Sequence, residues 1–301
     1  MRNVTWFQGL GVVLFVLSVT VNGHAQTSAD VKPPSRPTVK PAPRGDEQGV
    51  TKKNGGDFKP SSGIPTVDAI LDRLEAKGKA IKGLQCKLIY TYVMVEVVED
   101  RQIKEGTLRF AQGKPNSRFF VEFDKKIAGG TVDRQKEYFL FDGEWLIERN
   151  DRRKNVIKRQ IARKGERVDP FRLGKGPFPL PFGQKREEIL KYFKVTLKPF
   201  ELGDPLRTKH LHCVPRPNTQ MAKKYRRVEI YVDSKLDLPV RIVSERLSDN
   251  NRIEVDFKEI DVDAAPAGSW FRMDDIPGDF SIAEEPLPEQ PEIKAPHPSN
   301  R

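Results

Sequence analysis

The sequence predicts a mainly β (α+β) protein whose single sheet forms an unclosed antiparallel half-barrel of about eleven strands. Residues 119–124, 228–232 and 253–258 alternate apolar and polar or charged side chains with a period of two. That period is typical of antiparallel strands with one buried and one solvated face. Only two helices are expected, which is too few to cover so long a sheet. The sheet must therefore curl around its own apolar face.

The N-terminus has the features of a secretory signal. Arg2 gives a positive start, residues 9–21 are apolar, and Gly23-His24-Ala25 offers a cleavage site. We expect cleavage after Ala25, with an uncleaved anchor as the alternative. No cysteine near this site would accept a lipid, so an exported, periplasmic protein that is soluble after cleavage is expected.

Two stretches poor in large apolar residues flank one domain. Residues 26–62 are rich in Pro, Lys, Gly, Ser and Thr, and residues 283–301 are rich in Pro. Neither stretch can bury a core, so both are predicted to be disordered, the first as a linker and the second as a tail. Residues 63–282 form the domain between them.

The expected elements follow from periodicity and turn residues. A helix over residues 67–82 has Thr66 as its N-cap and Gly83 past its end, and a short helix covers residues 185–192. Asp142-Gly143 predicts a tight hairpin turn. The expected strands cover residues 84–99, 101–111, 118–124, 136–141, 144–149, 154–161, 193–198, 209–215, 225–233, 239–247 and 252–260, with a last extended piece around Trp270 and Phe271.

No catalytic motif, phosphate loop, zinc helix or dinucleotide fingerprint occurs in the sequence. His210 and His212 share one face of a strand while Cys213 points to the other, so no metal site is expected and a half-exposed strand face is the preferred interpretation. The outward-pointing carboxylates are Glu122, Glu229, Glu245, Glu254 and Asp256, with Arg227, Arg241 and Lys258 as expected cross-strand neighbours. We expect no enzyme activity and no cofactor.

The chain is strongly basic. Loss of Arg2 with the signal lowers the formal net charge from +11 to +10. In an exported protein this charge indicates an acidic protein partner or anionic lipid headgroups, not nucleic acid. The densest run contains Arg152, Arg153, Lys154, Lys158 and Arg159 and continues to residue 167. We interpret it as a docking surface, with a solvated sheet face as the alternative, and we expect a monomer.

The apolar face of the curled sheet is expected to line a ligand-binding cavity, because a wide sheet with few helices tends to leave one. An ordinary sealed core is the alternative. The expected lining residues are Leu108, Phe110, Phe119, Val121, Phe123, Val228, Ile230, Val240, Ile242, Val255 and Phe257. The loop over residues 169–184 contains Phe178 and Phe182, which are expected to form an apolar lid.

The two cysteines, Cys86 and Cys213, permit one disulfide in an oxidising compartment. Both lie in strand-like segments, so a bridge requires those strands to be adjacent. Two buried free thiols are the alternative.

Several motifs, taken in order, resemble one known family over residues 67–280. They are Gly83-Leu84-Gln85 after the first helix, Glu105-Gly106-Thr107-Leu108-Arg109-Phe110 ahead of Lys114-Pro115, Phe141-Asp142-Gly143-Glu144-Trp145-Leu146, Val262-Asp263-Ala264-Ala265, Trp270-Phe271-Arg272-Met273 and Pro277-Gly278. In this combination the chain is similar to the LolA/LolB-like periplasmic outer-membrane lipoprotein carriers.

The resemblance implies an unclosed barrel with lid helices, whose cavity shields acyl chains of lipids or lipoproteins without catalysis. The missing lipid-accepting cysteine favours a soluble, LolA-like carrier. Lys114 stands where the carriers have an arginine that contacts the lid, and lysine lacks its planar fork of donors. A LolA-like envelope sensor or scaffold that binds proteins is the second interpretation, and a lipid-acting enzyme is the third.

Overall fold

The computed structural model describes residues 60–95, 100–134, 136–168 and 185–288. Its helices are α1 (Pro65–Ala80), α2 (Arg186–Tyr192) and the 3-10 helix η1 (Gly268–Phe271). Its strands are β1 (Gly83–Met94), β2 (Asp100–Ala111), β3 (Arg118–Ala128), β4 (Thr131–Asp133), β5 (Glu137–Phe141), β6 (Trp145–Asn150), β7 (Asn155–Gln160), β8 (Phe193–Lys198), β9 (Thr208–Pro215), β10 (Tyr225–Asp233), β11 (Pro239–Arg246), β12 (Arg252–Asp261) and β13 (Ser281–Glu285).

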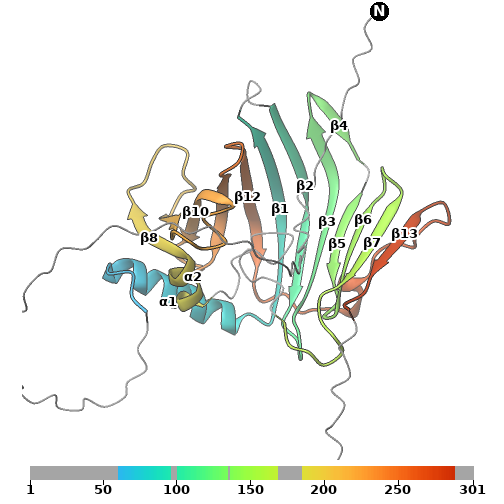
Figure 1. Cartoon of the computed structure of the whole chain (residues 1–301), viewed down its shortest axis with the longest axis horizontal. Coiled ribbons are helices and arrows are strands. Elements are labelled where there is room, and N and C mark those ends of the chain that lie inside the picture. Colours follow the sequence, from blue (N-terminus) through green and yellow to red (C-terminus); the bar gives the residue numbers. More distant parts are fainter. Residues whose placement is uncertain (1–59, 96–99, 135, 169–184, 289–301) are drawn as a thin grey trace, which may run out of the picture. The chain divides into compact units, whose positions relative to one another are not determined.

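All thirteen of these strands belong to one sheet. Their order is β13-β7-β6-β5-β3-β2-β1-β12-β11-β10-β9-β8, and β4 pairs with β3 beside this path. Among the described pairings only that of β13 with β7 is parallel. The two ends of the path, β13 and β8, do not pair, so the sheet is unclosed, and Figure 1 shows its strands curving. The predicted fold class, mainly β with an unclosed antiparallel sheet and two α-helices, is confirmed.

The sheet has more strands than the predicted eleven, and the two additional ones are short. β4 has three residues, and β13 has five residues that are all exposed. Neither strand has a buried face, so neither shows the alternation that a sequence pattern would detect. The predicted start of the disordered tail at residue 283 is wrong, because it cuts β13 in the middle.

The first helix begins earlier than predicted. Pro65 occupies its first turn and Ile64, not Thr66, is the N-cap residue. The Ser61 hydroxyl donates to a carboxylate oxygen of Asp68 at 2.6 Å, and the Ser62 amide donates to the other oxygen at 2.8 Å. These bonds satisfy donors at the helix entry. The end of the predicted linker is therefore an ordered part of the helix start.

Gly83, predicted as the residue past the end of the helix, has a second structural role. It begins β1, and a Cβ atom at this position would lie 2.3 Å from the carbonyl oxygen of Ala264 and 2.7 Å from Cγ of Pro266. No side chain can occupy that space without movement of the backbone. Glycine therefore lets the segment after β12 cross the start of β1 closely.

Within the described residues, the core consists of two clusters on opposite faces of the sheet. The large cluster covers one face, which we call the concave face, and it includes Val67, Ile70, Leu71 and Leu74 of α1. The small cluster, on the convex face, contains Phe120, Tyr138 and Leu140, against which Ile147, Phe271 and Met273 pack. The predicted extended piece near residue 271 is thus η1 and its flank, and it covers the convex face.

Candidate functional site

The concave face forms one continuous apolar surface. All the predicted lining residues except Val240 are buried and belong to the large cluster; Val240 is half-buried and lies outside it. Phe119 stacks on Phe141 with ring centroids 5.9 Å apart, and Phe123 meets Phe139 edge to face. The cluster extends from β5 and β6 to β8 and β9. Pairing in register, which places cross-strand neighbours on one face, produces this continuity.

The two α-helices pack on this face at its β8 end. They contact each other, and both contact β8 (Figure 1). Ile189 and Leu190 of α2 are buried in the large cluster together with the apolar residues of α1. The positions predicted for lid helices are therefore occupied by α1 and α2.

A buried arginine joins α2 to α1. Two guanidinium nitrogens of Arg186 lie 2.9 Å from a carboxylate oxygen of Asp72 and 3.1 Å from one of Asp68. The backbone amide of Arg186 donates to Glu75 at 2.8 Å. One planar group thus contacts two carboxylates of α1, an arrangement that suits arginine better than lysine.

A charged cluster lies at the other end of the concave face. Lys104 of β2 forms an ion pair with Glu137 of β5, and both side chains are largely buried. The Lys104 ammonium lies 5.6 Å from the ring centroid of Phe123 and 6.0 Å from that of Tyr90. Lys126 faces Lys104 in the β2–β3 register, and burial, followed by repulsion from Lys104, lowers the pKa of Lys126.

A second ion pair continues this cluster towards β7. Arg159 of β7 pairs with Glu148 of β6, and Glu148 is the cross-strand neighbour of Phe139. Burial raises the pKa of Glu148, and the charge of Arg159 opposes that shift. The concave face therefore combines a broad apolar floor with a charged end built from lysine, arginine and glutamate.

The charged end was missed by the sequence analysis, although part of it is visible in the pattern. Lys104 lies on the same face as Leu108, four residues away in one strand, so its inward position follows from period two. Its partner Glu137 is 33 residues away, and no local signal joins the two.

The structure describes one of the three predicted lid residues. Lys114 is exposed in the turn after β2. Phe178 and Phe182 lie outside the described residues. The buried polar residue of this turn is Asn116, whose amide nitrogen donates to the carbonyl oxygens of Gly143 at 2.7 Å and Glu166 at 2.8 Å.

The carbonyl oxygen of the Asn116 side chain is also used. It accepts a hydrogen bond from the Val168 amide at 2.7 Å. One side chain thereby connects the turn after β2, the β5–β6 hairpin and the chain that follows β7. A buried side-chain amide stabilises such a junction because loss of its hydrogen bonds would leave polar groups with an uncompensated desolvation cost.

Both cysteines are free and buried on the concave face. Cys86 is in β1 and Cys213 in β9, and β12, β11 and β10 lie between them in the sheet. The adjacency that a disulfide between these strands requires is absent, so the alternative of two buried thiols describes the structure. Burial raises the pKa of Cys86 to about 12 and also raises that of Cys213.

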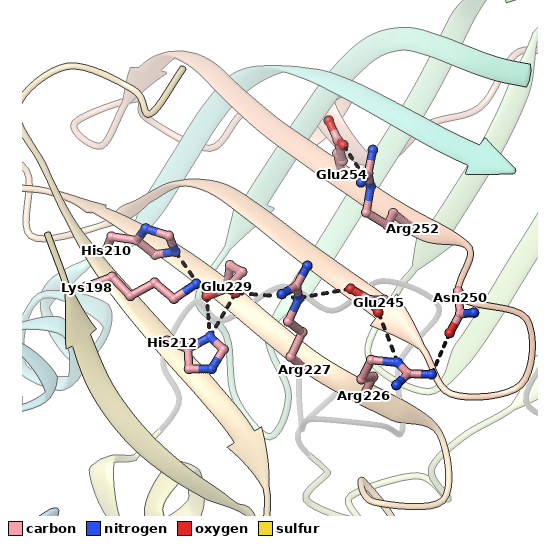
Figure 2. A network of polar contacts seen from close by, with 10 residues as sticks. All are labelled: Lys198, His210, His212, Arg226, Arg227, Glu229, Glu245, Asn250, Arg252 and Glu254. Carbon is pink, nitrogen blue, oxygen red and sulfur yellow. Dashed lines mark hydrogen bonds and ion pairs between the residues drawn. The ribbon is translucent and has the colours of Figure 1, made fainter. Parts of the chain in front are cut away.

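The convex face carries a polar network around Glu229, shown in Figure 2. Its carboxylate lies 3.0 Å from Nε2 of His210 and 2.8 Å from Nδ1 of His212, with Lys198 at 3.5 Å and Arg227 at 3.7 Å. His210 and Glu229 are buried, so the predicted half-exposed surface is correct only for His212. Among the described residues no group of three or more His, Cys, Asp or Glu side chains is arranged to hold a metal ion.

Two of the expected cross-strand charge pairs are present on this face, whereas Lys258 lies 3.7 Å from Asp256 of its own strand. Arg241 lies 2.8 Å from Asp256, and Arg227 lies 2.9 Å from Glu245. Both pairs are directly opposite in register. They connect β10, β11 and β12 on the face away from the apolar floor.

Four residues of the predicted basic docking surface are paired with carboxylates of the same chain. Arg152 contacts Asp133 at 2.7 Å. Lys154, Lys158 and Arg159 contact acidic side chains in or just before β13, namely Asp279, Glu284 and Glu285. Three of these four basic residues are therefore paired with the C-terminal strand or the residues just before it.

The helices in the described part of the chain are too short or too polar to cross a membrane. No family model and no curated protein matches the sequence. Solved structures similar to this chain include an uncharacterised conserved protein from Thermus thermophilus, with 12% identity, a TM-score of 0.43 and coverage of 73% of this chain and 99% of the other. LprF from Mycobacterium bovis has 12% identity, a TM-score of 0.39 and coverage of 72% and 98%.

A LolA superfamily protein from Nitrosomonas europaea is also similar, with 11% identity, a TM-score of 0.31 and coverage of 68% of this chain and 97% of the other. The fold assignment itself rests on the strand order and register of this sheet.

Proposed function

We propose that this protein is an exported, periplasmic, non-catalytic carrier that holds the acyl chains of a lipid or lipoprotein on its concave face. The observation that supports this most is the continuous apolar cluster on one face of an unclosed sheet. Burial of an acyl chain contributes about 0.8 kcal/mol per CH₂, so apolar area is sufficient to hold it and no catalytic group is needed.

The charged end of the concave face supports an amphiphilic ligand over a purely apolar one. Lys104 and Lys126 carry two positive charges and Glu137 one negative charge, so this group has a positive excess. An anionic headgroup at this end would leave the acyl chains directed over the apolar floor. Ligand sites commonly combine apolar walls with a few polar groups that fix orientation.

Two neighbouring lysines provide a matched test of this orientation. Lys126 lies on the concave face, whereas Lys125 pairs with Glu105 on the convex face. We expect Lys126→Met to weaken binding of the anionic fluorescent fatty acid cis-parinarate by about 3- to 10-fold, the effect of one partly screened charge. Lys125→Met should bind like the wild type, because its side chain points away from the apolar floor.

A neutral apolar dye, N-phenyl-1-naphthylamine, separates the headgroup effect from damage to the floor. Both variants should bind it like the wild type. No saturable binding of either probe by the wild-type chain would contradict the carrier function. Equal loss of parinarate binding in both variants would contradict the orientation but leave the carrier function standing.

A further inference from the structure

The C-terminal strand β13 is held on the edge of the sheet in an unusual way. It lies parallel to β7, with Ser281 opposite Asn155 and Glu285 opposite Arg159, and the Ser281 amide donates to the Lys154 carbonyl at 2.9 Å. All five of its residues are exposed, Ile282 included at 53%. No side chain of β13 therefore adds to the core, and main-chain pairing and charge hold the strand.

The charge pairs between the two strands lie on both faces of the edge. Lys158 contacts Glu284 at 2.8 Å, and Arg159 contacts Glu285 at 2.6 Å. Successive residues of a strand point to opposite faces, so the two adjacent glutamates match two adjacent cations, one on each side. Just before the strand, Asp279 contacts Lys154 at 2.6 Å. The carboxylates of all three pairs are exposed, so salt screens these pairs and limits their contribution to stability.

The segment before β13 is anchored much more firmly. Tyr138 donates to the Asp274 carboxylate at 2.7 Å, and Arg149 donates to the carbonyl oxygens of Asp274 at 2.7 Å and Asp275 at 3.2 Å. Phe271 packs on the small convex cluster. The chain can therefore remain in place up to residue 275 while β13 leaves, without loss of any buried apolar contact made by β13.

We propose that the β7 edge is a strand-addition site for an acidic, extended segment of a partner protein, and that β13 fills this site in the free chain. Departure of β13 exposes the unpaired amide and carbonyl groups of β7, which are a template for another strand. It also leaves Lys154, Lys158 and Arg159 without the acidic partners that β13 and its flank supply. The charges select a segment with two consecutive acidic residues, one for each face, as in Glu284-Glu285.

The test uses the full chain and a labelled peptide with the sequence of residues 278–288 as the acidic probe. In a parallel ladder the amides of alternate residues point to the neighbouring strand, so Ala283, like Ser281, directs its amide at β7. Ala283→Pro should therefore release β13. Ile282→Pro is the matched control, because its amide points away from β7 and an edge strand tolerates proline there.

We expect the Ala283→Pro chain to bind the peptide at least about tenfold more tightly than the wild type or Ile282→Pro, because the competing strand no longer occupies the edge. A peptide with both glutamates replaced by lysine should bind at least about tenfold more weakly. A chain carrying Glu284→Lys and Glu285→Lys should release β13 by repulsion instead. These exposed changes leave the core intact, and the chain should also gain affinity for the acidic peptide.

Three outcomes would overturn the proposal. If neither released chain gains affinity for the acidic peptide, or if both peptides bind equally well, the β7 edge is not a site for an acidic strand. The released chains form dimers in sedimentation, which assigns the edge to a second copy. The released chains bind vesicles containing phosphatidylglycerol but not the peptide, which assigns the basic residues to a lipid surface.

Discussion

At the scale of single residues, the concave face follows from local pattern, whereas the polar contacts that organise it do not. Period two places Phe119, Val121 and Phe123 on one face whatever the rest of the chain does, and all three are buried as predicted. Asn116 is different, because its partners Gly143 and Glu166 lie 27 and 50 residues away. Buried polar groups depend on such distant partners, and a sequence pattern gives no sign of them.

Asn116 should contribute strongly to stability. Asn116→Ala removes three hydrogen bonds of a buried side chain, to Gly143, Glu166 and Val168, which should cost about 2–4 kcal/mol of the free energy of unfolding. The neighbouring Ser117→Ala is the control and should change that free energy by less than about 0.5 kcal/mol. Urea denaturation measures both. A loss at Asn116 no larger than that at Ser117 would contradict the bridging role.

The thiols of Cys86 and Cys213 give a second test at this scale. In the folded protein neither should react with a thiol reagent at neutral pH, because both are buried and burial raises the pKa of each thiol. After unfolding without reductant both should react. Two unreactive thiols under those conditions would mean that a disulfide joins them after all.

At the scale of elements, the long strands were predicted well, whereas the ion pairs that Arg186 of α2 forms with α1 were not predicted. The bounds of β8 and β10 agree with the prediction residue for residue, because their ends coincide with changes in the alternation. The contact of Arg186 with Asp68 and Asp72 depends on how α1 and α2 pack on β8, which propensity alone does not determine.

Removal of the Arg186 ion pairs should destabilise α2 more than the sheet. Arg186→Met removes the charged contacts to α1, and we expect the free energy of local opening at α2 to fall by about 1–3 kcal/mol. Hydrogen exchange resolved by peptide should show faster exchange over residues 186–192 and unchanged exchange in β1. The exposed Lys185→Met is the control. Equally faster hydrogen exchange throughout the sheet would indicate general destabilisation and would contradict a specific role of Arg186 in holding α2.

At the scale of the whole molecule, counting strands against helices predicted an unclosed sheet, and the strand path from β13 to β8 confirms it. We interpreted the basic run as a docking surface and residues 283–301 as a disordered tail, and neither interpretation included a strand at residues 281–285. That strand, β13, has no buried side chain and pairs with β7 through its backbone and its charges. Such pairing leaves no hydrophobic pattern in the sequence.

The central claim is that the concave face holds an acyl chain. Native mass spectrometry of the full chain, exported and purified without detergent, tests it most directly. The account predicts a population with the added mass of a fatty acid, phospholipid or acylated protein, which disappears after delipidation and returns when an anionic lipid is added back. A spectrum with the unliganded mass alone, unchanged after addition of lipid, would contradict it.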